Sequence, residues 1–267
     1  MVSDKANECL DNETCLYPEP EFRIILPTTR RFYYWELRPF FELFNKYWGQ
    51  DQEVVVMGDA DPELDYPNLT YFDMPLQFRI DGLWIMHFFS SGIRWYLKEH
   101  MTADHFVMLQ TDFWLTAPPD LDGLRAVKRY MEDNPEVIRV GICPWPGSAT
   151  NNPYLEEEGE QDGVKFYHCK WKKPDCFLQM SNIPAMWNRH RLCEVWKDGW
   201  DGWACEGWGS DRLLKEFSEY RSVIAKPPVF FWNHVSYTRY KRVVLSNLPE
   251  EAREIVRPFI PGDFEVQ

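Results

Sequence analysis

A short apolar run near the middle of the chain constrains the fold more than any other feature. The run Phe106-Val107-Met108-Leu109 is too short for the core of a helix, so it predicts a β-strand that is buried on both faces. Strands of that kind are typical of parallel sheets with helices on both sides. The run ends just before Asp112, which we therefore expect at the carboxyl end of a central strand, where open α/β sheets bind ligands.

Further strands and helices are predicted to alternate along the chain. Apolar stretches predict strands at 22–26, 53–57, 69–73, 137–142, 164–168, 177–180, 223–225 and 229–232. Apolar residues at helical spacing predict helices near 37–47, 82–99, 120–134, 188–197 and 210–220. This alternation favours right-handed crossovers and hence an α/β, Rossmann-like, three-layer sandwich with a mostly parallel central sheet.

The 267 residues fit one domain, which we place at 21–245. Residues 1–20 are polar and predict an N-terminal arm or tail, and 246–267 form a C-terminal segment. Residues 151–163 are rich in acidic side chains and predict a mobile surface loop.

Composition and charge narrow the class of protein. The net charge of −13 argues against nonspecific nucleic-acid binding, so a nucleic-acid acceptor is not favoured. Acidic residues interrupt the N-terminus and no apolar window reaches about 18 residues, so we expect no integral membrane segment and a cytoplasmic protein. The seven cysteines include no CxxC pair, so we expect neither a disulfide framework nor a zinc ribbon.

Three segments carry a resemblance to a known family. They are Thr111-Asp112-Phe113, then Leu178-Gln179 with Ile183-Pro184-Ala185-Met186-Trp187, and then Trp203-Ala204-Cys205-Glu206 with Gly209-Ser210. In this order they resemble the motifs of nucleotide-sugar glycosyltransferases of the GT-A fold, within them a group of small bacterial and viral members. The resemblance covers roughly residues 22–240. It implies transfer of a sugar from a nucleotide-diphosphate sugar to the hydroxyl of a glycan, lipid-linked or other acceptor.

The resemblance places Asp112 at the diphosphate of the donor. A departing diphosphate needs its charge neutralised, commonly by Mn²⁺ or Mg²⁺ on oxygen ligands. Many relatives carry two carboxylates in this step, whereas here Thr111 and Phe113 flank a single Asp. A metal held by Asp112 with help from His234, and a site without metal, both remain open. The structural alternatives are that Asp112 caps a turn and that His234 is an ordinary surface histidine.

Glu206 is the second carboxylate of interest. By resemblance it faces the acceptor, where an inverting transfer needs a base for the hydroxyl proton. The alternative is an acid in the first turn of a helix that only complements the helix dipole.

The ends of the first two strands are the expected donor side. The resemblance assigns the nucleotide to the carboxyl ends of these two strands. We expect donor contacts there from Pro27, Thr28, Thr29, Arg30 and Asp59, together with Thr111, Asp112 and Phe113. Hydroxyls suit a base or ribose, and a guanidinium suits phosphate. A turn without a ligand is the alternative.

Sugar or acceptor contacts are expected from Gln179, Trp187, Trp203 and Trp208. Indole faces suit sugar rings, although large aromatic residues more often belong to the core, which is the alternative for Trp187.

Two other functions compete with a glycosyltransferase. A sugar-nucleotide pyrophosphorylase would need a glycine-rich phosphate loop after the first strand, where this chain has Pro27-Thr28-Thr29-Arg30-Arg31. A catalytically inactive glycosyltransferase-like protein that binds a nucleotide or glycan is favoured by the single carboxylate at Asp112.

Overall fold

The computed structural model describes residues 21–29, 34–75, 89–143, 155–169 and 179–267. Its strands are β1 (Ile24–Pro27), β2 (Val54–Gly58), β3 (Leu69–Asp73), β4 (His105–Met108), β5 (Phe113–Leu115), β6 (Val137–Gly141), β7 (Leu155–Gln161), β8 (Val164–Cys169), β9 (Ala185–Asn188), β10 (Arg221–Lys226), β11 (Trp232–His234), β12 (Ser236–Tyr237), β13 (Arg242–Val243) and β14 (Glu265–Val266). Its α-helices are α1 (Tyr34–Tyr47), α3 (Phe89–Glu99), α4 (Leu121–Asp133), α5 (Arg189–Val195), α6 (Gly202–Glu216) and α7 (Glu250–Val256).

One large sheet forms the centre of the molecule. Its strand order is β3-β2-β1-β4-β9-β6-β10-β8-β7. The pairs β3–β2, β2–β1, β1–β4 and β6–β10 are parallel, and within this sheet β9 and β8 run against the other strands. The structure therefore confirms the predicted α/β fold with a mostly parallel central sheet.

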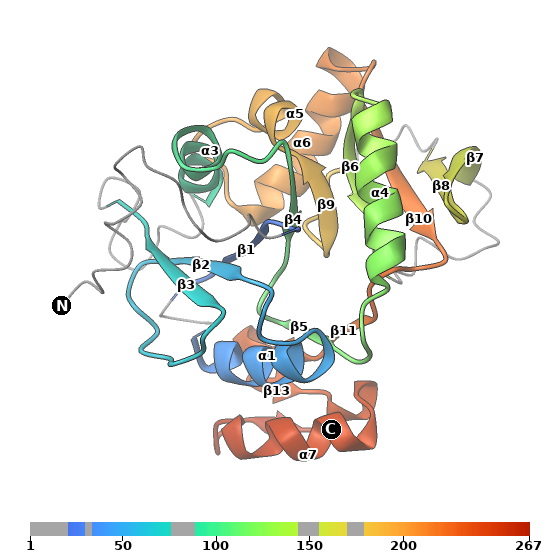
Figure 1. The fold of residues 1–267 in the computed structure, drawn as a ribbon. Coiled ribbons are helices and arrows are strands. Elements are labelled where there is room, and N and C mark those ends of the chain that lie inside the picture. Colours follow the sequence, from blue (N-terminus) through green and yellow to red (C-terminus); the bar gives the residue numbers. More distant parts are fainter. Residues whose placement is uncertain (1–20, 30–33, 76–88, 144–154, 170–178) are drawn as a thin grey trace, which may run out of the picture.

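Two hydrophobic clusters lie on the two faces of this sheet. Side chains alternate along the strands, so that Ile24 and Leu26 of β1 join the cluster under α1, α4 and α7, while Ile25 joins the one under α3, α5 and α6. Figure 1 shows α1 and α7 on one side of the strands and α3, α5 and α6 on the other. This division makes the three layers of the predicted sandwich.

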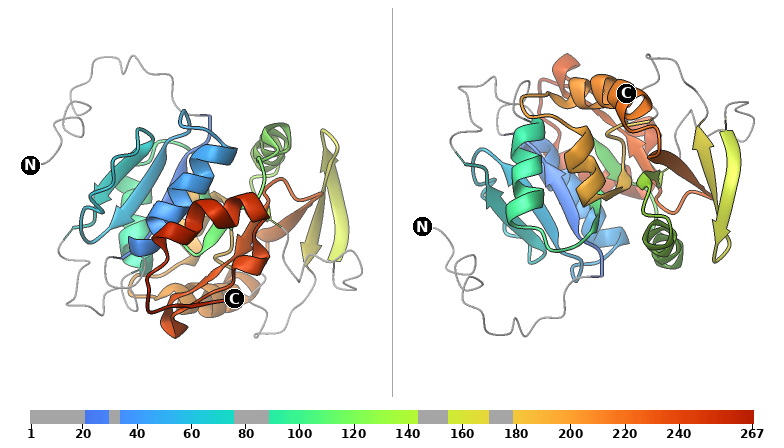
Figure 2. Two further views of the ribbon diagram at one scale, coloured as in Figure 1. Left: turned by 90° about the horizontal axis from the view of Figure 1, so that it is seen from below. Right: turned by 90° about the horizontal axis from the view of Figure 1, so that it is seen from above.

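The C-terminal segment packs onto α1. Leu248, Ala252 and Val256 are buried in the same cluster as the apolar face of α1, and the view from below in Figure 2 shows α7 lying across α1. Two small sheets, β11-β5 and β12-β13-β14, join this part of the chain to the segment after β4. The described residues contain no helix that is long and apolar enough to cross a membrane.

Three local expectations were wrong. The acidic residues 155–161 are not a loop but β7, which pairs with β8 around a turn at Asp162 and Gly163, both at positive φ (50° and 83°). Helix α6 begins at Gly202 rather than near 210, because Asp201 caps it by accepting a hydrogen bond from the amide of Ala204. Ala185–Asn188 forms a strand that the sequence did not predict, and of the strand expected at 177–180 only Gln179 and Met180 are described, in a bend.

Candidate active site

The turn after β4 brings Asp112 to His234. Strand β4 ends at Met108, and Asp112 lies directly before β5, which pairs antiparallel with β11 so that Phe113 is opposite His234. The Oδ2 atom of Asp112 is 2.9 Å from Nε2 of His234, and the two side chains are 27 % and 32 % exposed. The amide of Val235 donates to the carbonyl oxygen of Asp112 at 3.0 Å. The structure thus joins two residues that the sequence placed at one site, across 122 positions of the chain.

The Asp112–His234 pair fits part of a divalent metal site. The described residues contain no group of three or more His, Cys, Asp or Glu side chains that could hold a metal ion, so this pair supplies two ligands at most. In the structure this contact is a hydrogen bond of 2.9 Å, which an ion bound by both side chains would replace. A carboxylate oxygen is a ligand of Mn²⁺ and Mg²⁺, whereas imidazole is a commoner ligand of transition metals, so the pair suits Mn²⁺ better than Mg²⁺, with the remaining positions left to a diphosphate and water.

Thr111 and Phe113 lie beside Asp112 but are themselves buried. Thr111 is 4 % exposed and its hydroxyl donates to Oε2 of Glu36 at 2.5 Å. Phe113 is 7 % exposed, and its ring centroid lies 5.0 Å from that of His234. In this structure Thr111 thus contacts Glu36, and Phe113 packs on His234.

Glu206 lies in the second turn of α6, partly buried. Its Oε1 atom accepts hydrogen bonds from the amide of Asn182 at 2.6 Å and from the hydroxyl of Ser181 at 3.3 Å. Burial raises the pKa of Glu206, and the charge of Asp112 adds to the rise. The two candidate catalytic carboxyls therefore lie within electrostatic reach of each other. The first turn of α6 contains no acidic residue, so the alternative role of Glu206 as a first-turn acid is wrong.

A buried arginine binds the same turn as Glu206. Arg139 of β6 is 1 % exposed, and its Nε donates to the carbonyl oxygen of Ser181 at 2.9 Å. Its guanidinium lies 5.4 Å from the ring centroid of Trp187, and its Nη2 has no hydrogen-bond partner among the described residues. Burial lowers the pKa of Arg139 to about 10, and its charge lowers that of Glu206. Arg139 thus holds the turn that binds Glu206 and partly offsets the effect of burial on this carboxyl.

The carboxyl ends of β1 and β2 hold polar groups on the expected donor side. Thr28 and Thr29 follow Pro27, the last residue of β1, and they are 5 % and 1 % exposed; their hydroxyls have no hydrogen-bond partner among the described residues. Asp59 directly follows β2 and is half-buried, whereas Arg30 lies outside the described residues. A buried hydroxyl is costly without a partner, so the partners of these two hydroxyls come from outside the described residues, either from the chain itself or from a ligand at this end of β1.

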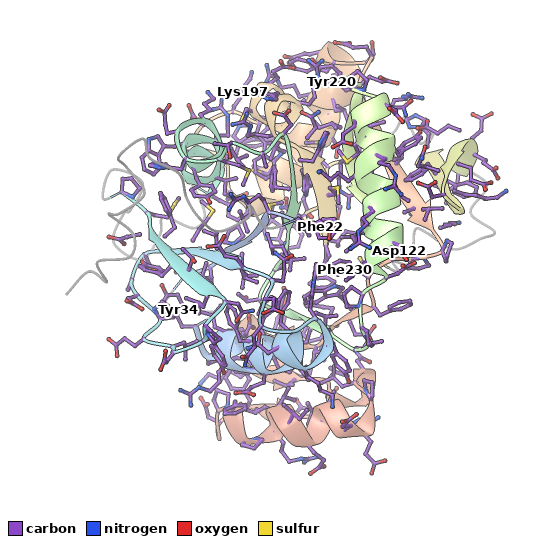
Figure 3. All side chains as sticks on the ribbon, viewed as in Figure 1. Phe22, Tyr34, Asp122, Lys197, Tyr220 and Phe230 are labelled. Carbon is purple, nitrogen blue, oxygen red and sulfur yellow. The ribbon has the colours of Figure 1, made fainter. Side chains whose placement is uncertain are left out.

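Tyr34 lies next to Asp59, on the side of the sheet where the donor is expected. Its hydroxyl donates to the carbonyl oxygen of Ala60 and accepts from the amide of Ala60 at 3.1 Å, and burial raises its pKa to about 12. A Cβ on Gly58 would lie 2.6 Å from this hydroxyl, so a larger residue at the end of β2 would displace the Tyr34 side chain. Figure 3 shows Tyr34 on the side of the molecule away from Tyr220, which follows α6.

The four predicted sugar-contacting residues separate into two groups. Trp187 is fully buried in the core between Trp196 and Arg139, so a sugar contact for Trp187 is wrong. Gln179 is also buried, at 1 %, and its side chain does not reach the surface. Trp203 and Trp208 of α6 are 61 % and 62 % exposed, on the helix that carries Glu206.

Sequence reasoning missed Glu36 and Arg139. Glu36 is four residues before Phe40 and eight before Phe44, so it falls on the apolar face of α1, and the structure buries it completely. Arg139 interrupts the apolar strand VIRVG. In both cases the sequence places a charged residue among buried apolar residues, and this pattern could have identified the residue as a functional candidate.

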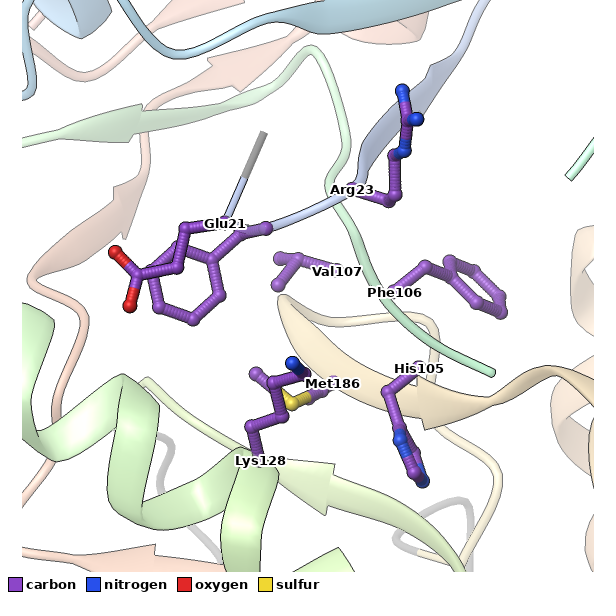
Figure 4. A pocket seen from close by; sticks show the side chains of 8 residues that line it. Glu21, Arg23, His105, Phe106, Val107, Lys128 and Met186 are labelled. Atoms are coloured by element: carbon purple, nitrogen blue, oxygen red, sulfur yellow. The ribbon is translucent and has the colours of Figure 1, made fainter. Parts of the chain in front are cut away.

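Two surface hollows lie away from this site. The hollow in Figure 4 has a volume of about 10 Å³ and includes His105, the first residue of β4, so it lies at the amino ends of the central strands. It has room for one water molecule at most. A hollow of about 320 Å³ lies between the end of α3 and α5, lined by Leu97, Lys98, Arg189, His190, Cys193 and Glu194. Neither hollow includes a predicted site residue.

No protein-family model and no curated protein matches this sequence. Among solved structures, the chain is similar to the mannosyltransferase PcManGT from Pyrobaculum calidifontis in complex with GDP-Man and Mn²⁺, at 17 % identity and a TM-score of 0.46, over 89 % of this chain and 64 % of that one. It is similar to residues 1–349 of TarS from S. aureus in complex with UDP-GlcNAc, at 13 % identity and a TM-score of 0.47, over 89 % of this chain and 65 % of that one. It is also similar to a UDP-glucose pyrophosphorylase complexed with UDP-glucose, at 10 % identity and a TM-score of 0.44, over 79 % of this chain and 91 % of that one.

This chain spans less than two thirds of the length of the first two of these structures. All three identities are below 25 % and all three TM-scores below 0.5. Such likenesses carry no argument about activity, so the function has to be inferred from the site.

Proposed function

We propose that this chain is a glycosyltransferase that moves a sugar from a nucleotide-diphosphate sugar to an acceptor hydroxyl. The observation that carries the proposal is the convergence of three groups beyond the end of β4. Asp112 and His234 are in contact there, and Glu206 binds the amide of Asn182 just before β9, whose first residue Ala185 pairs with Met108, the last residue of β4. A pair of metal-ligating type beside a partly buried carboxyl suits a reaction in which a diphosphate leaves while a hydroxyl attacks.

The donor would lie between β1, β2 and Asp112. The unpartnered hydroxyls of Thr28 and Thr29 and the carboxylate of Asp59 suit the base and ribose, and Arg30 is proposed to reach phosphate. Asp112 and His234 would hold an Mn²⁺ or Mg²⁺ ion at the diphosphate. When bound, this ion would offset the charge that develops on the leaving diphosphate.

Glu206 would act as the base. Both hydrogen bonds to Glu206 use Oε1, which leaves Oε2 to take the proton of the acceptor hydroxyl. The acceptor oxygen then forms a bond to the anomeric carbon, and the bond from that carbon to the diphosphate oxygen breaks with its electron pair on the diphosphate. A raised pKa makes Glu206 a better base near neutral pH than an ordinary glutamate. Trp203 and Trp208 would offer the acceptor their exposed indole faces.

The test is a panel of UDP, GDP and dTDP sugars incubated with the protein and Mn²⁺, with release of nucleoside diphosphate as the readout. We expect release with at least one donor, and a loss of at least about a hundredfold in Asp112→Asn, the scale for removing a charge-stabilising group. The matched control is Asp104→Asn, because Asp104 makes the same 2.9 Å contact with a histidine, His190, but directly before β4, at its amino end. This control should keep full release.

Three results would contradict the proposal. One is no release and no binding for any donor. The second is full release in a folded Asp112→Asn variant, and the third is an equal loss in Asp104→Asn. Tight donor binding without release or transfer to any acceptor would favour the inactive, ligand-binding alternative.

A further inference from the structure

A fully buried carboxylate lies directly beneath the Asp112–His234 pair. Glu36 is the third residue of α1 and is 0 % exposed. Three hydroxyls donate to it: that of Thr111 to Oε2, and those of Ser236 and Thr238 to Oε1. Among the described residues no ion pair of Glu36 is found. The hydrogen bonds from these three hydroxyls therefore offset the free-energy cost of burying the Glu36 side chain.

Two of these hydroxyls also contact each other and a neighbouring indole. The indole Nε1 of Trp35 donates to Oγ1 of Thr238 at 3.2 Å, and this oxygen lies 3.0 Å from Oγ of Ser236, a contact in which either hydroxyl can donate. The ring of Trp35 is held in turn by edge contacts with Trp114 and Phe264, whose centroids lie 6.2 Å and 4.9 Å away. Glu36 therefore acts as an acceptor in a network with little freedom to rearrange.

The three hydroxyls belong to the two segments that carry the candidate metal ligands. Thr111 directly precedes Asp112, and Ser236 lies two residues after His234. Between these points the amide of Val235 donates to the carbonyl oxygen of Asp112. Glu36 thus joins both segments to the first turn of α1, which is anchored by its buried apolar face of Leu37, Phe40, Phe41 and Phe44.

We propose that Glu36 is a positioning residue that fixes the segments of Asp112 and His234 against α1, at a separation from which both side chains would hold one divalent cation. This inference rests on the proposed function for its use of the cation, but the positioning itself does not depend on the identity of the donor. A buried carboxylate is a costly way to fill space, because an apolar side chain of similar size often gives equal or greater stability. Burial raises the pKa of Glu36, with the charge of Asp112 as the next cause, and the three hydroxyl hydrogen bonds act against this rise.

The test compares Glu36→Gln with a matched control of similar burial. Gln52 is 8 % exposed and donates to the carbonyl oxygens of Phe22 and Glu53 at 2.7 Å and 2.9 Å, at the amino ends of β1 and β2. Gln52→Leu therefore breaks buried hydrogen bonds far from the site. Ser236→Ala removes one of the three hydroxyls and serves as a milder variant if Glu36→Gln does not fold.

Two measurements are made on each folded variant. The first is hydrogen exchange of the Val235 amide, which reports the bond between the two segments without any ligand. The second is the affinity for Mn²⁺ in the presence of UDP or GDP. In Glu36→Gln we expect Val235 to exchange at least about tenfold faster and Mn²⁺ to bind at least about tenfold more weakly than in Gln52→Leu, with smaller changes in the same direction in Ser236→Ala.

The two measurements test the role of Glu36 separately from the proposed function. Unchanged Val235 exchange in Glu36→Gln, or equal acceleration in Gln52→Leu at the same loss of melting temperature, overturns the positioning role. Faster Val235 exchange with unchanged Mn²⁺ affinity also overturns it, since the cation would not depend on that separation. A wild-type protein that binds neither Mn²⁺ nor a nucleoside diphosphate overturns the proposed function, and the exchange of Val235 still decides whether Glu36 holds the two segments.

Discussion

Replacement of Glu206 by glutamine tests the proposed chemistry most directly. Glutamine keeps the size of the side chain and an oxygen at the position of Oε1, which accepts from the amide of Asn182 and the hydroxyl of Ser181 at 2.6 Å and 3.3 Å. It removes the basic carboxylate. Binding and proton transfer should therefore be separated by a single change.

The expected magnitudes follow from these contacts. Glu206→Gln loses the charge assistance of two hydrogen bonds, about 1 kcal/mol each, and it avoids the cost of burying a carboxylate in a place that raises its pKa. The two terms oppose each other, so the free energy of unfolding should change by no more than about 1 kcal/mol. Transfer should fall by roughly a hundred- to ten-thousandfold, because no other described group is proposed to take the acceptor proton.

The assay measures donor affinity, melting temperature and transfer rate on one preparation. The control is Asp201→Ala, which removes the N-cap of the same helix and should cost about 1 kcal/mol of stability. Transfer should persist, since within the described part of the chain the side chain of Asp201 binds no group other than the amide of Ala204. Near wild-type transfer in a folded Glu206→Gln variant would refute the base role. A loss of donor binding together with transfer would assign Glu206 to the donor instead.

Three further outcomes are expected. Because burial raises the pKa of Glu206 above its ordinary 4.5, the base is lost by protonation at a higher pH, so the acidic limb of the transfer-rate profile should lie above pH 4.5. Gly123→Ala should lower the free energy of unfolding by about 1–3 kcal/mol, since its Cβ would lie 2.4 Å from Val229, whereas Gly202→Ala in open surroundings should be neutral or slightly stabilising in thermal melts. Trp203→Ala should raise the acceptor KM about tenfold with donor hydrolysis unchanged, and an unchanged KM would remove Trp203 from the acceptor site.

The fold was predictable where burial left a simple pattern. The apolar runs of β1, β2, β4 and β6 were found because strands buried on both faces are apolar throughout. Strand β7 was missed because an exposed strand of LEEEGEQ has the composition of a loop. The Asp162-Gly163 turn was its only local signal, since both residues need positive φ in a tight hairpin.

The site was predictable in part. Asp112 stood out because it follows a buried apolar strand, whereas Glu206 was found through the resemblance carried by Trp203-Ala204-Cys205-Glu206 and Gly209-Ser210. The start of α6 was misplaced because Gly202, Gly207 and Gly209 weaken helical propensity, and the N-cap at Asp201 decided the boundary. The roles of Glu36 and Arg139 depend on partners far away in the sequence, such as Ser236 and Ser181, and no local pattern contains those contacts.

The position of β9 has a consequence for the biosynthesis of this protein. Strand β9 lies between β4 and β6, both of which leave the ribosome before it. The nascent chain therefore cannot join β4 to β6 until residue 188 has emerged, and β8 and β7 cannot join the sheet until β10 has emerged at residue 226. The contact between Asp112 and His234 forms later still. Contacts of such long sequence separation form late and slowly. A chain whose synthesis stops before His234 would have most of its sheet but would lack the contact between Asp112 and His234, so premature products of translation should lack the candidate active site.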